Sequence, residues 1–388
     1  MSPIGRVGLA ISVLLWASCE GRTAIRVSRD AGEVKANSHA GQTVQVAQCP
    51  EGTSPRVVPA DTPVKLDLLF MIDDSPSMQE EQANLARNFP RLIDALKALP
   101  AGFPDLHLGV VSSDMGAGTA ILIGGCNRSL GDRGVLQVRS DCGLDPSAGR
   151  YLISQNGGTQ NNFAGDISDV FACLANLGTN GCGFEHQLQA VRMALSGFVA
   201  DNAGFLRSDA HLAVVYITDE DDCSAPADST FFENLTYNGQ DTSLRCSLAG
   251  HVCSGKAPPA EVFSTPLANC SAASDGGGKL IPVSTFIDEM RLLRTQSVSV
   301  SVIGGWPADV ASANYAIGYD MSTTQSSNLL GSMPICESAN GKAVVELRMK
   351  QFVDAFGPAG QIMSICQDDF SNAMKQIGNL IGTTVECQ

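Results

Sequence analysis

The segment FMIDDSPSM, residues 70–78, ends an apolar run with two aspartates and two serines around a proline. Asp73, Ser75 and Ser77 alternate along this stretch, and alternate residues of a tight loop can point their oxygen atoms to one side. One carboxylate and two hydroxyls that converge in this way suit a hard divalent cation, which prefers oxygen ligands. The spacing therefore predicts a site for Mg²⁺ or Ca²⁺. The alternative is that the segment only caps the following helix, an ordinary role for Asp and Ser.

A second acidic cluster, ITDEDDCS at residues 217–224, places Asp219 directly at the end of another apolar run. Ligands of open α/β sheets bind beyond the carboxyl ends of the strands, so two strands are expected to deliver carboxylates to one edge. This pairing favours the metal interpretation over capping. The neighbouring Glu220, Asp221 and Asp222 have two interpretations, a second site of the Ca²⁺ type or a solvent-exposed acidic loop.

The elements around these residues alternate between strand and helix. Apolar runs rich in β-branched residues predict strands buried on both faces, as in a parallel sheet covered by helices. The expected strands are 66–72, 106–113, 211–218, 298–305 and 361–366, and the expected helices are 79–99, 283–294 and 368–381. The alternation predicts an α/β fold with a doubly wound, mostly parallel central sheet flanked by helices.

Three parts of the chain fall outside this alternation. Residues 20–62 lack hydrophobic periodicity and predict a flexible tether, so the folded domain is expected to span 63–388. The segments at about 114–165 and 223–280 are rich in Gly, Ser, Asn and Cys. Because long structureless loops in a compact domain need staples or a function, we expect disulfide-stapled insertions at strand ends.

The N-terminus has the layout of a secretory signal sequence, with an apolar stretch too short to cross a bilayer comfortably. A cysteine after two small residues resembles the lipobox of bacterial lipoproteins. Residues 1–19 are therefore expected to act as a signal sequence, with Cys19 as the lipidated residue. Trp16 stands where the lipobox commonly has a branched aliphatic residue, so plain secretion is the alternative. Either way the protein is exported, and a lipid anchor on Cys19 would place it in the cell envelope, on the periplasmic or surface face of a membrane.

The cysteine count supports export. Setting Cys19 aside leaves 12 of the 13 cysteines, an even number spread over loops, which indicates disulfides. No Cys-x-x-Cys pair is present to favour a zinc site. The local pairings that we expect are Cys126 with Cys142, Cys173 with Cys182, and pairs among Cys223, Cys246, Cys253 and Cys270.

Charge and missing motifs exclude several function classes. With 40 acidic and 25 basic residues the formal net charge is −15, which repels nucleic acid, so no nucleic acid partner is expected. The sequence has no Gly-x-Ser-x-Gly elbow, no phosphate-binding loop and no His-Glu-x-x-His helix. We therefore expect no enzyme. A hydrolase that activates water on the metal would need a general base, for which the sequence offers no candidate of the expected kind.

The segment FMIDDSPSM resembles the Asp-x-Ser-x-Ser element of von Willebrand factor A domains, whose metal-ion-dependent adhesion site takes the Asp and both Ser from this loop. The resemblance implies Asp73, Ser75 and Ser77 as metal ligands. The family's further Asp corresponds to Asp219 in VVYITDED. Its Thr most resembles Thr179 in NLGTNGCGFEHQLQAV, a stretch without the family's usual Gly-Gly-Thr pattern.

The resemblance covers roughly residues 64–382 and implies a binding function. A site with few carboxylates and several hydroxyls leaves Mg²⁺ or Ca²⁺ under-neutralised, so it attracts an external carboxylate. In the family, a Glu or Asp of a protein partner completes the coordination shell. We therefore expect an exported, membrane-anchored binding or adhesion protein that engages a protein ligand through the metal. The alternative is an envelope scaffold or assembly component, in which the metal is structural and the Cys-rich insertions make the contacts.

Overall fold

The computed structural model describes two compact units, residues 1–55 with 387–388, and residues 56–386. Side chains are described over 64–118, 125–126, 129–226, 229–232, 242–258, 267–293, 295, 297–307, 332 and 334–387, and the backbone also over 26–30, 33–37, 43–45, 319–320 and 331. The first unit holds a three-stranded antiparallel sheet of β1 (Arg26–Asp30), β2 (Glu33–Asn37) and β3 (Thr43–Gln45). These strands lie within the segment predicted as a tether. The predicted signal sequence and Cys19 lie outside the described residues.

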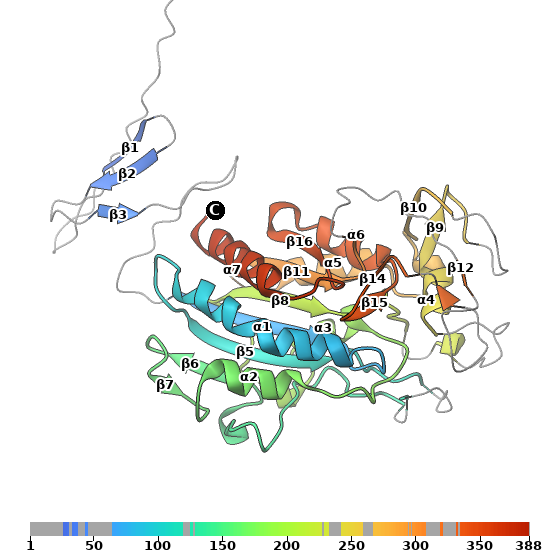
Figure 1. The fold of residues 1–388 in the computed structure, drawn as a ribbon, viewed down its shortest axis with the longest axis horizontal. Coiled ribbons are helices and arrows are strands. Elements are labelled where there is room, and N and C mark those ends of the chain that lie inside the picture. The colour runs from blue at the N-terminus through green and yellow to red at the C-terminus, as the bar shows by residue number, and fades with distance from the viewer. Residues whose placement is uncertain are drawn as a thin grey trace, which may run out of the picture. The chain divides into compact units, whose positions relative to one another are not determined.

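The second unit is built on a seven-stranded sheet in the order β16-β11-β8-β4-β5-β6-β7 (Figure 1). Its strands are β4 (Lys65–Ile72), β5 (Asp105–Ser112), β6 (Leu152–Gln155), β7 (Gln160–Asn161), β8 (His211–Ile217), β11 (Val298–Gly304) and β16 (Gly360–Ser364). From β16 to β5 neighbouring strands are parallel, whereas β6 and β7 pair antiparallel at the edge. All five predicted strands are present and form the parallel part.

Helices cover both faces of this sheet. They are α1 (Gln79–Lys97), α2 (Ile167–Ala175), α3 (Gln187–Leu195), α4 (Thr242–Gly250), α5 (Val283–Leu292), α6 (Leu347–Asp354) and α7 (Ser371–Glu386). Side chains of α1, α2 and α7 share one apolar core with Leu68 and Phe70 of β4. Those of α3, α5 and α6 share a second core with Leu69 and Met71. Because alternate residues of one strand enter opposite cores, the predicted doubly wound α/β fold is confirmed.

The two Cys-rich segments contain secondary structure of their own. Residues 114–165 supply β6 and β7, which extend the edge of the central sheet beyond β5. Residues 223–280 hold α4 and the antiparallel pair β9 (His251–Cys253) and β10 (Cys270–Ala272). Two further antiparallel pairs join β12 (Tyr319–Asp320) to β13 (Gly331–Ser332) and β14 (Cys336–Ser338) to β15 (Gly341–Ala343). Within the described part, no helix is long and apolar enough to cross a membrane.

Five disulfides join described cysteines of the second unit. They are Cys126–Cys182, Cys142–Cys173, Cys223–Cys246, Cys253–Cys270 and Cys336–Cys366. The expected pairing among the four cysteines from 223 to 270 is confirmed, but Cys126–Cys142 and Cys173–Cys182 are wrong. Cys142 packs into the apolar core that contains α2, where Cys173 lies, whereas Cys126 and Cys182 share a separate cluster. The core that each cysteine enters decides its partner, not closeness in sequence.

Candidate metal centre

Asp73 lies at the carboxyl end of β4 and is fully buried. Its amide donates to the carbonyl of Ile217 at 2.9 Å, which ties the ends of β4 and β8 together. Its Oδ1 accepts the amide of Ser75 at 2.8 Å and the Ser113 hydroxyl at 3.1 Å, and Oδ2 accepts the Thr218 hydroxyl at 2.8 Å. Three neighbouring strand ends therefore fix the orientation of this carboxylate.

Ser75, Ser77 and Asp219 continue from Asp73 as one polar cluster. The hydroxyls of Ser75 and Ser77 lie 3.1 Å apart, and the side chain of Ser77 is hydrogen-bonded to the Asp219 carboxylate. Asp219 is only 3% exposed, yet its Oδ1 has no hydrogen-bond partner. Ser77 is exposed, so solvent reaches the cluster on that side. The fold thus brings four of the five predicted ligands together.

The capping interpretation of this segment is wrong. Helix α1 begins at Gln79, and its N-cap residue, Met78, makes no side-chain hydrogen bond to the helix. The Asp73 carboxylate is engaged by the Ser75 amide and by two hydroxyls, and not by the first turn of the helix. Capping therefore does not explain why Asp73 and Ser75 stand in this loop.

Thr179, the fifth predicted ligand, lies in a segment that is tied to this loop through Gln82. The side chain of Gln82 links the two segments, because its amide donates to the carbonyls of Asp73 at 2.8 Å and Gly178 at 2.9 Å. Thr179 itself lines a pocket of about 570 Å³ between residues of α1 and the end of α2. No contact of the described residues joins its hydroxyl to Asp73 or Ser75, and its role as a ligand stays a prediction.

Three buried glutamates that the sequence analysis did not single out surround the cluster. Glu81 of α1, Glu185 before α3 and Glu346 before α6 are each at most 1% exposed. Both carboxylate oxygens of Glu81 and Oε2 of Glu185 and of Glu346 have no hydrogen-bond partner. A buried ionised carboxylate without a partner is unfavourable unless a positive charge compensates it. The arrangement therefore fits a hard cation.

The pKa values of these groups follow the same physics. Burial raises the pKa of Asp219 well above its usual range, and the charges of Glu220, Asp73 and Glu81 raise it further. Burial, followed by the charges of Glu80 and Asp73, raises the pKa of Glu81 to about 7. Burial and the charges of Glu220, Asp73 and Asp219 likewise raise the pKa of Glu185. Each shift shows that the fold disfavours the ionised carboxylate, first through burial and then through neighbouring negative charge.

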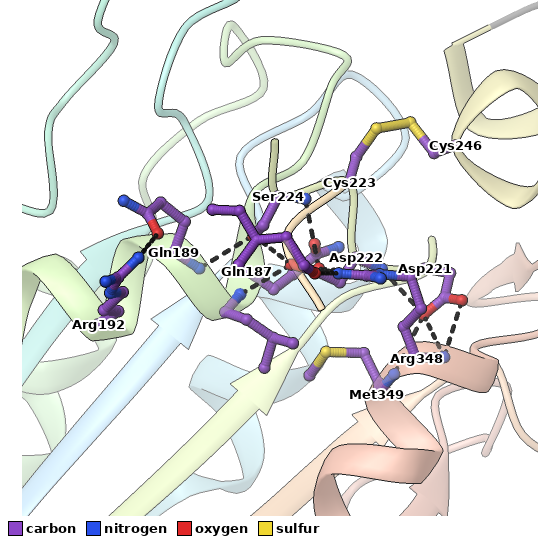
Figure 2. Close-up of polar contacts among 12 residues, drawn as sticks. Gln187, Gln189, Arg192, Asp221, Asp222, Cys223, Ser224, Cys246, Arg348 and Met349 are labelled. Atoms are coloured by element: carbon purple, nitrogen blue, oxygen red, sulfur yellow. Dashed lines mark hydrogen bonds and ion pairs between the residues drawn. A yellow bond between two sulfur atoms is a disulfide. The ribbon is translucent and has the colours of Figure 1, made fainter. Parts of the chain in front are cut away.

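Asp221 and Asp222 belong to a different arrangement, and both interpretations offered for them are wrong (Figure 2). They are 3% and 0% exposed, so they form no solvated acidic loop. Asp221 accepts the amides of Arg348 at 3.0 Å and Met349 at 3.2 Å, at the start of α6, and contacts Nε2 of His251 at 2.5 Å. These partners satisfy the carboxylate of Asp221 without a cation from solution.

Asp222 is satisfied by a similar set of partners. Its Oδ2 accepts Nη2 of Arg348 at 2.8 Å, an ion pair whose two side chains are both fully buried. Its Oδ1 accepts the amide of Leu188, at the start of α3, at 2.9 Å and the hydroxyl of Ser224 at 2.6 Å. Asp221 and Asp222 therefore anchor α6 and α3 to the loop after β8 and are not metal ligands.

No protein-family model and no curated protein matches the sequence. Many solved structures are similar to it, among them the following three. The pilus adhesin SpaC from Lactobacillus rhamnosus GG, in its open conformation, is 10% identical with a TM-score of 0.35, over 94% of this chain and 33% of that one. The human COPII-coat protein Sec24c is 10% identical with a TM-score of 0.36, over 89% of this chain and 37% of that one. The pilus adhesin RrgA from Streptococcus pneumoniae is 12% identical with a TM-score of 0.31, over 95% of this chain and 55% of that one. The chain thus spans 33% to 55% of these proteins, and at these TM-scores the likeness carries no argument about function.

Proposed function

We propose that this protein binds Mg²⁺ or Ca²⁺ through Asp73, Ser75, Ser77 and Asp219, and that it engages a protein ligand through the bound cation. One observation carries the proposal: two carboxylates from two strand ends meet through two serine hydroxyls, and a buried oxygen of Asp219 has no partner. When bound, the cation would supply a positive centre for an oxygen ligand. The exposed Ser77 leaves a side on which a partner carboxylate could approach.

Isothermal titration of Ca²⁺ and Mg²⁺ into the chelator-treated, disulfide-intact chain tests this site. The parent should bind at least one of the two cations, and Asp73→Ala should bind it at least 100-fold more weakly, because the variant lacks a carboxylate ligand. Asp145→Ala, which removes an exposed aspartate from the 114–165 segment, is the matched control and should bind as the parent does. Retained binding in Asp73→Ala, or no binding in the parent, would contradict the proposal.

A structural role for the cation is the second candidate. The buried carboxylates Glu81, Glu185 and Glu346 favour it, because they would compensate the cation's charge from within the chain. A shielded structural cation resists mild chelation, whereas a cation that binds a partner is exposed and exchanges. The rate of cation loss to a chelator, compared with the rate of unfolding, separates these two functions. Loss that is slow and tracks unfolding supports the structural role.

We also propose export and lipid anchoring at Cys19. The five disulfides support the export part, because disulfides persist in oxidising compartments. Replacing Cys19 with Ala should move the protein from the membrane fraction to the soluble exported fraction. Unchanged membrane association of that variant would count against the anchor.

A further inference from the structure

Glu185 is a buried glutamate that is not among the four proposed ligands of the cation. Its carbonyl accepts the amide of Cys223 at 2.8 Å, in the loop that follows β8. The next residue, His186, donates its amide to the carbonyl of Ser113 at 3.1 Å, just after β5. The backbone at Glu185 is therefore held between the loops that follow the two strands flanking β4.

The side chain of Glu185 has no positive partner. No ion pair of the described residues includes it, its exposed fraction is 1%, and its Oε2 has no hydrogen-bond partner. Its carboxyl forms a hydrogen bond with that of Glu220, and the charges of Asp73 and Asp219 act on it directly. Two carboxyls that face each other beside two further aspartates cannot both be ionised at low cost unless a positive charge lies between them.

We propose that Glu185 is a third carboxylate ligand of the cation bound by Asp73 and Asp219, and that it makes the site prefer Ca²⁺ to Mg²⁺. The inference rests on the proposed function, since it concerns the same cation. Ca²⁺ takes six to eight oxygen ligands in a flexible geometry, and its affinity rises with the number of charged ligands. Mg²⁺ demands near-ideal octahedral geometry and is usually held by one or two carboxylates with several waters.

Glu185 has to turn toward the cation for this role. The ligand atoms of the three carboxylates do not all lie within 4.8 Å of one another, the span that would hold one ion. Mutual repulsion disfavours a close approach of carboxylates without a cation, and a bound cation would remove that repulsion. Thr179 lines the separate pocket beside α1, so Glu185 takes the place in the ligand set that the sequence analysis gave to Thr179.

The test is isothermal titration of Ca²⁺ and of Mg²⁺ into the chelator-treated full chain, for the parent, Glu185→Gln and Glu346→Gln. Glu346→Gln is the matched control, because Glu346 is also a buried glutamate on which Asp73 and Asp219 act, but its Oε1 accepts the Gly305 amide. Glu185→Gln should raise the Ca²⁺ dissociation constant at least tenfold and change that of Mg²⁺ less than threefold. Glu346→Gln should weaken the binding of both cations by the same factor, because it removes a nearby negative charge but no proposed ligand.

Several results would overturn the inference. A Ca²⁺ affinity of Glu185→Gln within threefold of the parent would do so. An equally selective loss of Ca²⁺ affinity in Glu346→Gln would also do so, since it would show a charge effect and not ligation by Glu185. If the parent binds and Asp73→Ala does not, the proposed function stands in either case. Thermal unfolding in chelator checks that the variants fold. Should Glu185→Gln not fold, Glu185→Asp, which keeps the charge but shortens the side chain, should show the same loss of Ca²⁺ affinity.

Discussion

Asp219 and Asp221 stand two residues apart in the loop after β8, are equally buried at 3% exposure, and have opposite surroundings. The carboxylate of Asp221 accepts backbone amides at the start of α6 and contacts His251. Asp219 keeps an oxygen without a partner and lies among other carboxylates, whose charges raise its pKa. Protein groups satisfy the carboxylate of Asp221, whereas one carboxylate oxygen of Asp219 has no hydrogen-bond partner.

The difference shows how neighbouring residues of one type divide between structure and binding. A buried charge that is paired and hydrogen-bonded is tolerated, whereas an unpaired one is costly. Asp221 and Asp222 meet helix starts and Arg348, so they stabilise the packing of α3 and α6. The cluster of Asp73 and Asp219 meets hydroxyls and further carboxylates, and no ion pair among the described residues includes either aspartate, so a bound cation would compensate its charge.

The largest expected effect concerns the buried ion pair of Arg348 and Asp222. Arg348→Met should lower the free energy of unfolding by about 3–5 kcal/mol, because it leaves the charge of Asp222 buried without its cationic partner. Cation affinity should stay within threefold of the parent. Chemical denaturation in chelator and titration of Ca²⁺ measure the two quantities.

Lys350→Met is the matched control for Arg348→Met, since Lys350 lies on the same helix but pairs with the exposed Asp354. It should cost less than about 1 kcal/mol. A loss below about 1 kcal/mol in Arg348→Met, or a large loss of cation affinity in it, would mean that the two regions are not distinct in the way described.

The next effect compares the stabilities of variants at Asp219 and at Asp221. In chelator, Asp219→Asn should be as stable as the parent or more stable, because it removes an uncompensated buried charge. At a cation concentration of 100 times the dissociation constant, the free energy of unfolding of the parent should rise by about 2.7 kcal/mol, and that of Asp219→Asn should not rise. Asp221→Asn should instead lower stability with and without the cation. Thermal unfolding of all three proteins in chelator and in Ca²⁺ tests this, and equal behaviour of the two variants would contradict it.

The smallest effect per measured step is a pH dependence of stability. The folded protein raises the pKa of Glu81 from 4.5 to about 7, so between these values it binds more protons than the unfolded chain. The stability of the cation-free protein should therefore fall as pH rises from about 4.5 to 7, by up to about 1.4 kcal/mol per pH unit for this group. Glu81→Gln should flatten the fall. Denaturation midpoints in chelator across this range measure it, and an unchanged slope in the variant would count against the assignment to Glu81.

Most of the parallel sheet could be predicted from the sequence. The runs that became β4, β5, β8 and β11 are mostly apolar, because these strands are buried on both faces, and the shorter β16 contains the apolar pair Ile362 and Met363. The edge strands β6 and β7 were not predicted, since they are short and partly exposed. Helix α2 was also not identified, although Asp166 caps it and Ile167, Val170 and Phe171 follow the helical period.

The candidate site likewise has residues that the sequence predicted and residues that it did not. Asp73, Ser75 and Ser77 were found because closely spaced residues stay close in any fold, and Asp219 because it ends a recognisable strand. Glu81, Glu185 and Glu346 gave no such signal, since acidic residues at or near the start of a helix are common. Only burial distinguishes them from surface glutamates, and burial depends on how α1, α3 and α6 pack.

The sequence by itself therefore determined the α/β class, the parallel strands and the oxygen-rich loop after β4, because local spacing and hydrophobic period are properties of short segments. Tertiary structure alone decided which cysteines pair, that Asp221 and Asp222 are satisfied by helix starts and Arg348, and which carboxylates surround Asp219. The physical reason is that the energy of a buried charge depends on groups that lie within a few ångströms in space, and most of those groups are distant in the chain.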